Sequence, residues 1–449
     1  MKKIDFMKLK TPKEGDRLLE RLAGDGFEAY YVGGCVRDLI LGVEPKDWDI
    51  CTDATPEEMK RSFSGYKTID TGIKHGTLTV ILDQLPFEVT TYRIDGRYSD
   101  HRRPDFVAFS GSLADDLSRR DFTVNAMAFH PAEGLVDLFA GRRDLEQGIL
   151  RCVGKPVERF EEDALRIMRA LRFASRLDFQ IEEDTGKALL GCGHLLDRIA
   201  VERIRAELDQ FLCGPGVRRL AGAYRDVMGQ IIPEVRPMFD LDQENPYHAY
   251  DVWEHTLRVV ENSPKSSVSR LAALFHDMGK PAVKTVDEEG RGHFYGHEKV
   301  SLEVARRVMD RLKYDNATRE KVLTLVQYHG IVFQPTDKYA RKLLRRLGEE
   351  NLFLLIGQSL ADVKSQHPDC VARRVDRIEA FRHAVESVLA KAQCFSLKDL
   401  AVKGDDLLRL GIPQGEEVGR CLNILLERVI EGEVKNQRED LLALIEKRR

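Results

Sequence analysis

The chain has 449 residues, of which 43% are hydrophobic and 32% are charged, with 70 Lys and Arg against 74 Asp and Glu. Two to four packed units are expected at this length, and the composition excludes a disordered scaffold. The formal net charge of −4 excludes nucleic-acid binding through overall charge, so any such site must come from local clustering.

Apolar runs and cysteines indicate the compartment. There is no run of about 18 apolar residues and no apolar signal core at the N-terminus, so we expect a soluble, cytoplasmic protein without a membrane partner. The absence of any CxxC pair argues against a zinc ribbon or a disulfide framework and predicts buried free thiols. The cysteines are Cys35, Cys51, Cys152, Cys192, Cys213, Cys370, Cys394 and Cys421.

Short apolar runs alternate with turn residues in the N-terminal third. Residues 14–27 have the pattern of an amphipathic helix, and the following run predicts a strand at Ala29–Val32. Similar runs predict strands at 48–51, Thr77–Leu82, 87–92, Val107–Phe109, 123–130 and 134–137. Together they predict a small mixed sheet with a few helices, ending near residue 150.

From residue 156 onward, apolar residues recur at three- and four-residue spacing, which predicts helices apart from a Gly-rich loop at 287–296. The expected fold is an α/β N-terminal head with a mixed sheet, followed by an all-α remainder. We place the boundaries at 1–150 for the head, 151–240 for a helical neck, 241–370 for a metal-binding domain and 371–449 for a helical tail.

Two carboxylates give the densest chemical signal. Asp47 and Asp49 flank Trp48 on an expected strand, so its period of two places both on one face, where they can share divalent cations. In-line nucleotidyl transfer with two metal ions needs such a pair. Glu88, the acid of the apolar run 87–92, is the best candidate for a third ligand. Alone, this pair would more often be a solvated turn.

The segment before these carboxylates favours an anion site. Gly33 and Gly34 end the first strand, and a helix follows with Val36, Arg37 and Asp38. Paired glycines let backbone N–H groups approach an anion closely at the positive end of that helix.

GGCVRD at 33–38 and DWD at 47–49 resemble the signature of the nucleotidyltransferase superfamily headed by DNA polymerase β, specifically class II CCA-adding enzymes and bacterial poly(A) polymerases. TGIKHGT at 71–77, SRRDFTVNAMA at 118–128 and ERFEEDALRIMRALRFASRL at 158–177 agree in order. The resemblance implies addition of CCA to tRNA 3′ ends from CTP and ATP, with Mg²⁺ in the head and no DNA partner. It assigns sugar recognition to Arg120, Asp121 and Asn125.

One helix carries a candidate base-reading pair. Asp163 and Arg166 are three apart and so share a face, where a carboxylate and a guanidinium can imitate a Watson–Crick edge. Such a pair could accept cytosine and adenine, which carry an amine, and reject uracil and guanine. The alternative is a local salt bridge. The resemblance implies that the pair acts as the protein template, while Arg169 and Arg172 contact phosphate or pair locally.

Two segments bear on the choice between CCA and poly(A) addition. The polar segment 92–109 resembles the flexible loop of full CCA-adding enzymes, although many such loops are only connections. Residues 397–445 resemble the tail of CCA-adding enzymes from Gram-positive bacteria. Basic helix faces at 338–348 and 371–383 could line a tRNA or be ordinary solvated surfaces. The basic residues near the loop are Arg93, Arg97, Arg102, Arg103, Arg119 and Arg120.

A histidine set lies in the helical half. His276 and Asp277 form an HD doublet, with further His and Asp residues at wide spacing that suit a divalent metal. The set resembles that of HD metal-dependent phosphohydrolases. The resemblance implies a basic site of His255, His276, Asp277 and Asp362, with His297 and His329 completing a second metal position. The site could also be vestigial.

Three rival functions stay open. The same head would serve a poly(A) polymerase or a partial CC- or A-adding enzyme. The principal activity could instead be that of an HD-domain phosphohydrolase. A silent RNA-binding protein is the third, which the intact carboxylates disfavour.

Overall fold

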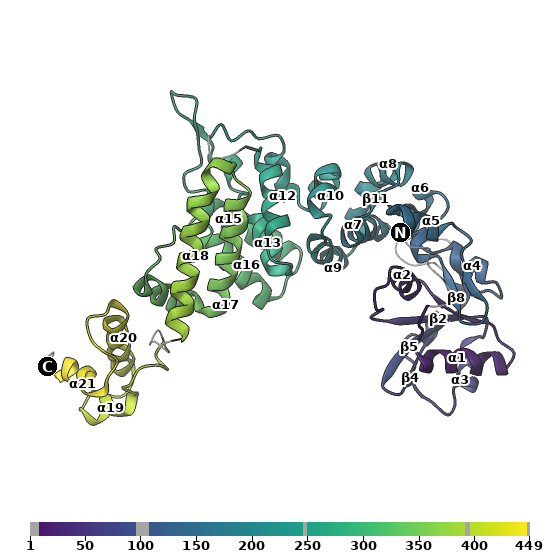
Figure 1. Ribbon diagram of the computed structural model, residues 1–449, viewed down its shortest axis with the longest axis horizontal. Coiled ribbons are helices and arrows are strands. Elements are labelled where there is room, and N and C mark those ends of the chain that lie inside the picture. The colour runs from purple at the N-terminus through teal and green to yellow at the C-terminus, as the bar shows by residue number, and fades with distance from the viewer. Residues whose placement is uncertain (1–8, 96–106, 246–248, 391–395, 447–449) are drawn as a thin grey trace. The chain divides into compact units, whose positions relative to one another are not determined.

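The computed structural model describes residues 9–95, 107–245, 249–390 and 396–446, which form two compact units, Met1–Pro233 and Glu234–Arg449. Most of the polar segment 92–109, including Arg97, Arg102 and Arg103, lies outside the described residues. The helices and sheets given below are those of the described residues of each unit (Figure 1).

The first unit is built on a mixed sheet, as the alternating apolar runs predict. Its strand order is β3-β4-β5-β2-β1-β8-β9, in which β2 and β5 are parallel and the other neighbours antiparallel. The strands are β1 (Ala29–Val32), β2 (Trp48–Thr52), β3 (Lys67–Ile69), β4 (Thr77–Leu82), β5 (Leu85–Thr91), β8 (Ala128–His130) and β9 (Gly134–Val136). A separate pair joins β6 (Arg93–Asp95) and β7 (Val107–Phe109).

Helices α1 (Lys13–Gly24) and α3 (Pro56–Ser62) contact each other and the sheet (Figure 1). Leu18, Leu19 and Leu22 form the buried face of α1, at the three- and four-residue spacing of an amphipathic helix. A capping box between Thr55 and Glu58 starts α3, so orphan backbone donors at its N-terminus are satisfied. Helix α2 (Gly34–Ile40) follows β1 directly.

Part of the predicted 123–130 strand is a 3₁₀ turn, η3 (Thr123–Asn125), before β8. This correction matters because the turn, not a strand, carries Asn125. Asn125 Nδ2 donates to Asp121 Oδ1 at 3.1 Å, and such side-chain bonds compete with ladder pairing.

The helices of the first unit follow the sheet, and one prediction about them is wrong. The single helix expected through 158–177 is two helices, α6 (Pro156–Glu162) and α7 (Leu165–Leu177). Asp163 has extended backbone angles (φ −136°, ψ 102°), and its Oδ1 accepts from the Leu165 N–H at 3.1 Å. Its carboxylate therefore satisfies one of the free backbone donors at the start of α7. The other elements are α4 (Leu113–Ser118), α5 (Gly141–Gln147), α8 (Glu183–Cys192), α9 (Val201–Leu212), α10 (Val217–Ala223), α11 (Arg225–Ile231) and the parallel pair β10 (Ile149–Leu150) and β11 (Gln180–Ile181).

The second unit is helical, with one small departure from prediction. The expected Gly-rich loop contains a two-stranded hairpin, β12 (Thr285–Val286) and β13 (Gly292–His293). Its helices are α12 (Val252–Asn262), α13 (Ser267–Phe275), α14 (Lys280–Val283), α15 (His297–Arg311), α16 (Asn316–Tyr328), α17 (Asp337–Lys364), α18 (Pro368–Ala390), α19 (Gly404–Arg409), α20 (Glu416–Glu431) and α21 (Arg438–Glu446). Helix α18 packs along α17, which bends at Gly348.

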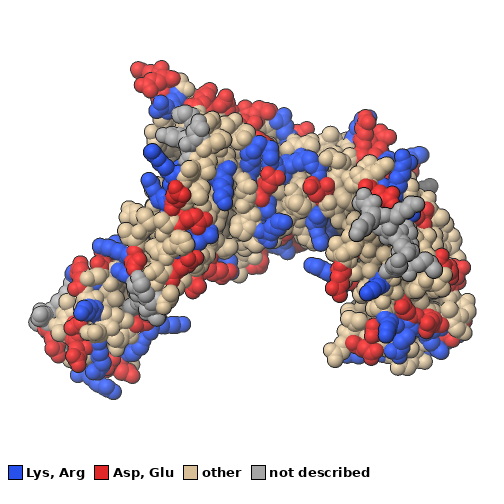
Figure 2. Space-filling model, in the orientation of Figure 1, with Lys and Arg blue, Asp and Glu red and all other residues tan. Residues whose placement is uncertain are grey.

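The C-terminal helices α19–α21 share a small core of their own, which includes Leu407, Leu425 and Leu441. Lys338 and Lys342 of α17 pair with Glu431 of α20. These lysines, on a helix face proposed for tRNA, are therefore partly neutralised within the unit. Basic and acidic side chains are interspersed over the face shown in Figure 2, in keeping with the balanced composition.

The thiols of Cys35, Cys51, Cys152 and Cys192 are buried and free, as expected, whereas Cys213 and Cys421 are only half-buried. Within the described residues, every helix is too short or too polar to cross a bilayer.

Candidate active site and metal centre

The three predicted head carboxylates lie on or beside two adjacent strands. Asp49 of β2 is in register with Glu88 of β5, and because the strands are parallel both side chains project from the same face. Asp47 is exposed just before β2 begins. Asp47 and Asp49 line a cavity of about 440 Å³, and Glu88 is exposed on the neighbouring strand.

The charge around Asp49 favours a cation. Burial, together with Glu88 and Asp47, raises the pKa of the Asp49 carboxyl to about 6, against the opposing effect of Arg120. Neighbouring carboxylates disfavour one another's ionised forms, and a bound cation relieves this. An all-oxygen ligand set fits a hard divalent ion such as Mg²⁺.

Gly33 lets a guanidinium approach the first strand. Its φ of 78° is in the left-handed region, and a Cβ there would lie 2.7 Å from Arg120 Nη1. Asp116 holds Arg120 from behind, with Arg120 Nη2 donating to Asp116 Oδ2 at 3.0 Å and Arg119 Nη2 donating to Oδ1 at 2.5 Å. Asp116 itself is fully buried. The buried Asp116 carboxylate thus holds Arg120 where its positive charge acts on Asp49.

Four of the predicted nucleotide-binding residues form one hydrogen-bonded chain. Arg37 Nη1 donates to Asn125 Oδ1 at 2.6 Å, and Asn125 in turn donates to Asp121. Asp121 Oδ2 accepts from Arg169 Nε and Nη2 at 2.8 and 2.6 Å. Burial alone would raise the pKa of Asp121, but Arg169 and Asn125 lower it to about 2. The chain links α2, η3 and α7 on one wall of the cavity.

The sequence pattern did not single out Phe173 or Arg176, which also line the cavity. The Phe173 ring lies 4.2 Å from Arg172 and 5.2 Å from Arg37, measured from ring centroid to guanidinium carbon. Arg172 is also paired with Glu207 at 2.7 Å. The periodicity of α7 carried the signal, because residues 169, 172, 173 and 176 repeat at three- and four-residue spacing.

Asp163 and Arg166 lie one turn apart, with the Arg166 N–H donating to the Asp163 carbonyl at 2.9 Å. They do not share a helix, and neither lines the head cavity. Asp163 Oδ2 lies 3.4 Å from Arg203, and Arg166 Nη1 donates to Glu162 at 2.6 Å. Arg166 is 8% exposed and its Nη2 also donates to the Arg119 carbonyl at 3.1 Å. Both side chains thus have partners other than each other.

In the second unit, four histidines share one hydrogen-bonding pattern. Each Nδ1 faces a backbone carbonyl, which can only accept, so a neutral ring carries its proton there and keeps a lone pair on Nε2. The distances are 3.3 Å from His255 to Ser365, 2.7 Å from His276 to Ala273, 2.8 Å from His297 to Phe294 and 2.6 Å from His329 to Val326.

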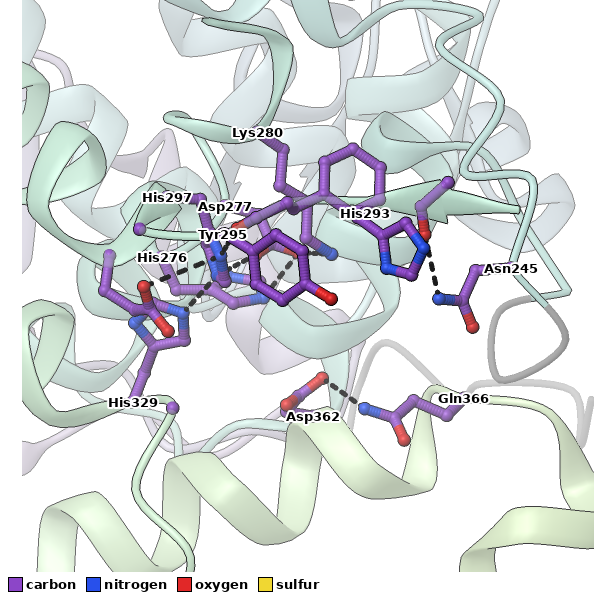
Figure 3. Close-up of a pocket in the computed structure, with 15 residues that line it drawn as sticks. Asn245, His276, Asp277, Lys280, His293, Tyr295, His297, His329, Asp362 and Gln366 are labelled. Atoms are coloured by element: carbon purple, nitrogen blue, oxygen red, sulfur yellow. Dashed lines mark hydrogen bonds and ion pairs between the residues drawn. The ribbon is translucent and has the colours of Figure 1, made fainter. Parts of the chain in front are cut away.

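His276, His297 and His329 gather around Asp277 (Figure 3), and His255 Nε2 lies 3.6 Å from Asp277 Oδ2. His276 Nε2 lies 3.1 Å from Asp277 Oδ2, and His297 Nε2 lies 3.4 Å from Oδ1. His297 and His329 face each other through Nε2 atoms 3.0 Å apart. Two such lone pairs repel unless a cation or proton lies between them.

The cluster offers two groups that could each hold a metal ion, with ligand atoms within 4.8 Å of one another. One group is His255, His276 and Asp277, and the other is Asp277, His297 and His329. Asp362 Oδ1 lies 3.1 Å from His255 Nε2 and accepts from Gln366. The mixed nitrogen and oxygen donors suit a first-row transition metal.

Lys280 also belongs to the cluster around Asp277, although the sequence pattern did not predict it. Its Nζ lies 2.7 Å from Asp277 Oδ2 and donates to Gln243 Oε1 at 2.7 Å, and the side chain is buried. Although burial would raise the pKa of Asp277, His276 and Lys280 hold it well below its usual range. The signal was present, because Lys280 follows the HD doublet at helical i,i+3 spacing.

Comparisons with known proteins cover most of the chain. Residues 29–151 match the poly A polymerase head domain, residues 178–235 the RNA and SrmB-binding site of polymerase A, and residues 294–445 the tRNA nucleotidyltransferase domain 2. A CCA-adding enzyme of Enterococcus faecalis is 34% identical over 97% of this chain and 96% of its own length. One from Lactococcus lactis subsp. lactis is 34% identical over 98% of this chain and all of its own.

A solved structure shows the same fold. The CCA-adding enzyme of Bacillus stearothermophilus, crystallised in complex with CTP, aligns with a TM-score of 0.73 and 28% identity, covering 98% of both chains.

Proposed function

The chain belongs to the CCA-adding enzyme family, and from that premise we propose that its head adds CCA to the 3′ end of tRNA from CTP and ATP. The observation that carries the proposal is the Asp49–Glu88 register, with Asp47 and Asp49 lining a cavity that arginines also line. Nucleotidyl transfer needs such an oxygen cluster next to cationic phosphate-binding groups.

The reaction joins the 3′-oxygen of the RNA to the α-phosphorus of CTP or ATP, and pyrophosphate leaves. Mg²⁺ held by Asp47 and Asp49, with Glu88 as third ligand, would offset charge and lower the pKa of the attacking hydroxyl. Arg176 lines the cavity and suits triphosphate oxygens, while Arg120 stays assigned to the sugar with Asp121 and Asn125.

The sugar is assigned to the other wall of the cavity. Gly33 and Gly34 allow close backbone approach, and the chain Arg37–Asn125–Asp121–Arg169 presents preoriented polar groups for the nucleotide. Asp163 and Arg166 stay our candidates for reading the base edge. Because Arg203 and Glu162 hold them here, base reading would require both side chains to exchange partners.

The test uses tRNA that ends at the discriminator base, with CTP, ATP and Mg²⁺, and sequences the product ends. Ends that carry CCA and stop there are expected. Long A tails would instead establish a poly(A) polymerase, and arrest after CC would establish a partial enzyme.

A second function is favoured by Asp277 lying between two groups of imidazoles. We propose an HD domain at 241–370 that binds divalent metal and acts as a phosphohydrolase. The chemistry that a bound metal supplies is a nucleophile derived from water at neutral pH. Metal content and phosphate release should both be lost in Asp277→Ala. Full phosphate release without metal would contradict the proposal.

The remaining organisation follows from this assignment. We propose a head at 1–150, a neck at 151–240 and a tRNA-binding tail at 371–449, in a protein that works in the cytoplasm, where tRNA is matured and repaired. Limited proteolysis followed by mass spectrometry of the fragments tests the boundaries. Cuts confined to the interior of the proposed segments would contradict them.

A further inference from the structure

An aromatic pair, of which Tyr295 is exposed and His293 half-buried, lies beside the imidazole cluster of the second unit. The rings of His293 and Tyr295 are stacked, with centroids 5.3 Å apart and planes 9° from parallel. Both line the cavity of about 380 Å³ that contains His276 and Asp277. Figure 3 shows them on one wall, with Asp362 and Gln366 on the opposite wall. Tyr295 is 79% exposed, the highest value among the exposed large hydrophobic side chains described.

The pair is held in place by the hairpin. His293 Nε2 lies 2.8 Å from Asp287 Oδ2, and Asp287 Oδ1 accepts from the N–H groups of Glu289 and Arg291. Gly292 N–H donates to the Glu244 carbonyl at 2.8 Å. A single exposed aromatic is common on protein surfaces. A tyrosine stacked on an anchored ring, at the rim of a polar cavity with metal-ligating residues, is a preoriented aromatic face.

A second cavity, of about 140 Å³, borders the same cluster. It shares His329, Gly330 and Asp362 with the first, so the two cavities flank these residues. Arg374 and Arg377 of α18 line it. Arg377 is exposed and makes no ion pair in the described part of the chain, whereas Arg374 donates to Gln366. An unpaired arginine next to a polar cavity is suited to phosphate.

We propose that this pocket takes the end of a single-stranded oligonucleotide of at least two nucleotides. One base stacks on Tyr295, the adjacent phosphoester reaches the Asp277 cluster, and the next phosphate contacts Arg377. The proposal rests on the phosphohydrolase assigned to this site above. In the hydrolysis, the oxygen of water adds to phosphorus, the P–O bond to the leaving oxygen breaks, and that oxygen takes up a proton.

This arrangement explains why the aromatic face and the arginine lie on either side of the cluster. Stacking tolerates any base, because each base has a π-face, and the arginine reads only the backbone. A small phosphomonoester would use neither wall.

The binding test uses the full-length, metal-loaded protein and a dinucleotide that contains 2-aminopurine, whose fluorescence is quenched when it stacks. Tyr295→Ala should raise the Kd by between about fivefold and 150-fold. Tyr295→Phe should restore binding. Val286→Ala is the matched control, because Val286 is exposed on the same hairpin and does not line the cavity. Wild-type quenching in Tyr295→Ala would overturn the proposal.

The second arm tests the length of the ligand. Arg377→Ala should weaken binding of the dinucleotide but not of the 2-aminopurine mononucleotide, and Arg373→Ala, an exposed neighbour outside the cavity, should change neither. Equal losses for both ligands, or none, would overturn the two-nucleotide assignment.

The quenching needs no turnover, so the two proposals can fail separately. Quenching that depends on Tyr295, without any cleavage of the dinucleotide, would refute the hydrolase and support the aromatic subsite. Cleavage of the dinucleotide with an unchanged KM in Tyr295→Ala would do the reverse.

Discussion

The two candidate sites of this chain gather metal-ligating side chains by different routes. In the head, Asp47 and Asp49 lie at the start of one strand, and Glu88 joins them through the register of a parallel neighbour. In the second unit, His255 lies inside helix α12, and the other candidate ligands lie at or near the ends of four further helices. The first site depends on local periodicity, and the second on tertiary packing.

The two sites also balance charge differently. Burial, Glu88 and Asp47 raise the pKa of Asp49 to about 6, whereas His276 and Lys280 hold the pKa of Asp277 well below its usual range despite burial. The head therefore gains most from an added cation, while the second site already contains positive partners. The ligand types point the same way, with oxygen alone in the head and mixed nitrogen and oxygen in the second unit.

The largest effect is expected at the buried ion pairs that Asp116 makes with Arg119 and Arg120 in the head. Asp116→Ala would leave Arg119 and Arg120 without their buried partner, at a cost of about 3–5 kcal/mol in the free energy of unfolding. Urea denaturation in a Trp253→Phe background measures it, because Trp48 then reports on the first unit alone. The control, Asp115→Ala, removes a bond to Ser110 and should cost about 1 kcal/mol. Equal costs for the two variants would contradict this account of Arg120.

An intermediate effect concerns base selection in the head. Arg166→Ala should reduce the preference for CTP and ATP over UTP and GTP by roughly 1–3 kcal/mol, because a base-edge contact is lost. The ratios of kcat/KM for the four nucleotides measure it. Arg169→Ala, one turn along α7, should instead weaken all four alike, since Arg169 holds Asp121. Unchanged ratios in Arg166→Ala would remove this residue from base reading.

An effect of comparable size is expected in the second unit. Gln366 donates to Asp362 Oδ1 at 3.2 Å, so Gln366→Ala should weaken metal binding by about 10- to 100-fold, as loss of a hydrogen bond to a ligand does. Calorimetric titration with Mn²⁺ measures this. Lys364→Ala, exposed on the same helix, is the control. Equal metal affinity in both variants would contradict the role of Asp362 as a metal ligand held by the Gln366 hydrogen bond.

Much of the head could be predicted from sequence because its signals are local. The strands at Ala29–Val32 and Thr77–Leu82 have the predicted bounds, and the Asp49–Glu88 register follows from two apolar runs pairing. The break at Asp163 could not be predicted from residues that all tolerate a helix. Its extended backbone is stabilised by the Leu165 N–H and the distant Arg203. Tertiary contacts overrode local propensity there.

For the second site, the sequence could predict which histidines take part but not how they are held. The histidines could be identified by type and spacing, whereas the Nδ1–carbonyl bonds, Lys280 and Gln366 depend on how separate helices pack. The roles of Asp163 and Arg166 stay predictions, because their partners in this structure are other side chains.

Nucleotide addition by Asp49→Ala and Asp277→Ala, compared side by side on tRNA lacking CCA, tests the central claim most directly. The head assignment predicts a loss of about 10³-fold or more in Asp49→Ala, since several kcal/mol of charge stabilisation disappear. It predicts wild-type addition of C, C and A in Asp277→Ala, whose site is in the other unit. Wild-type addition in Asp49→Ala, or its loss in a folded Asp277→Ala, would contradict the account.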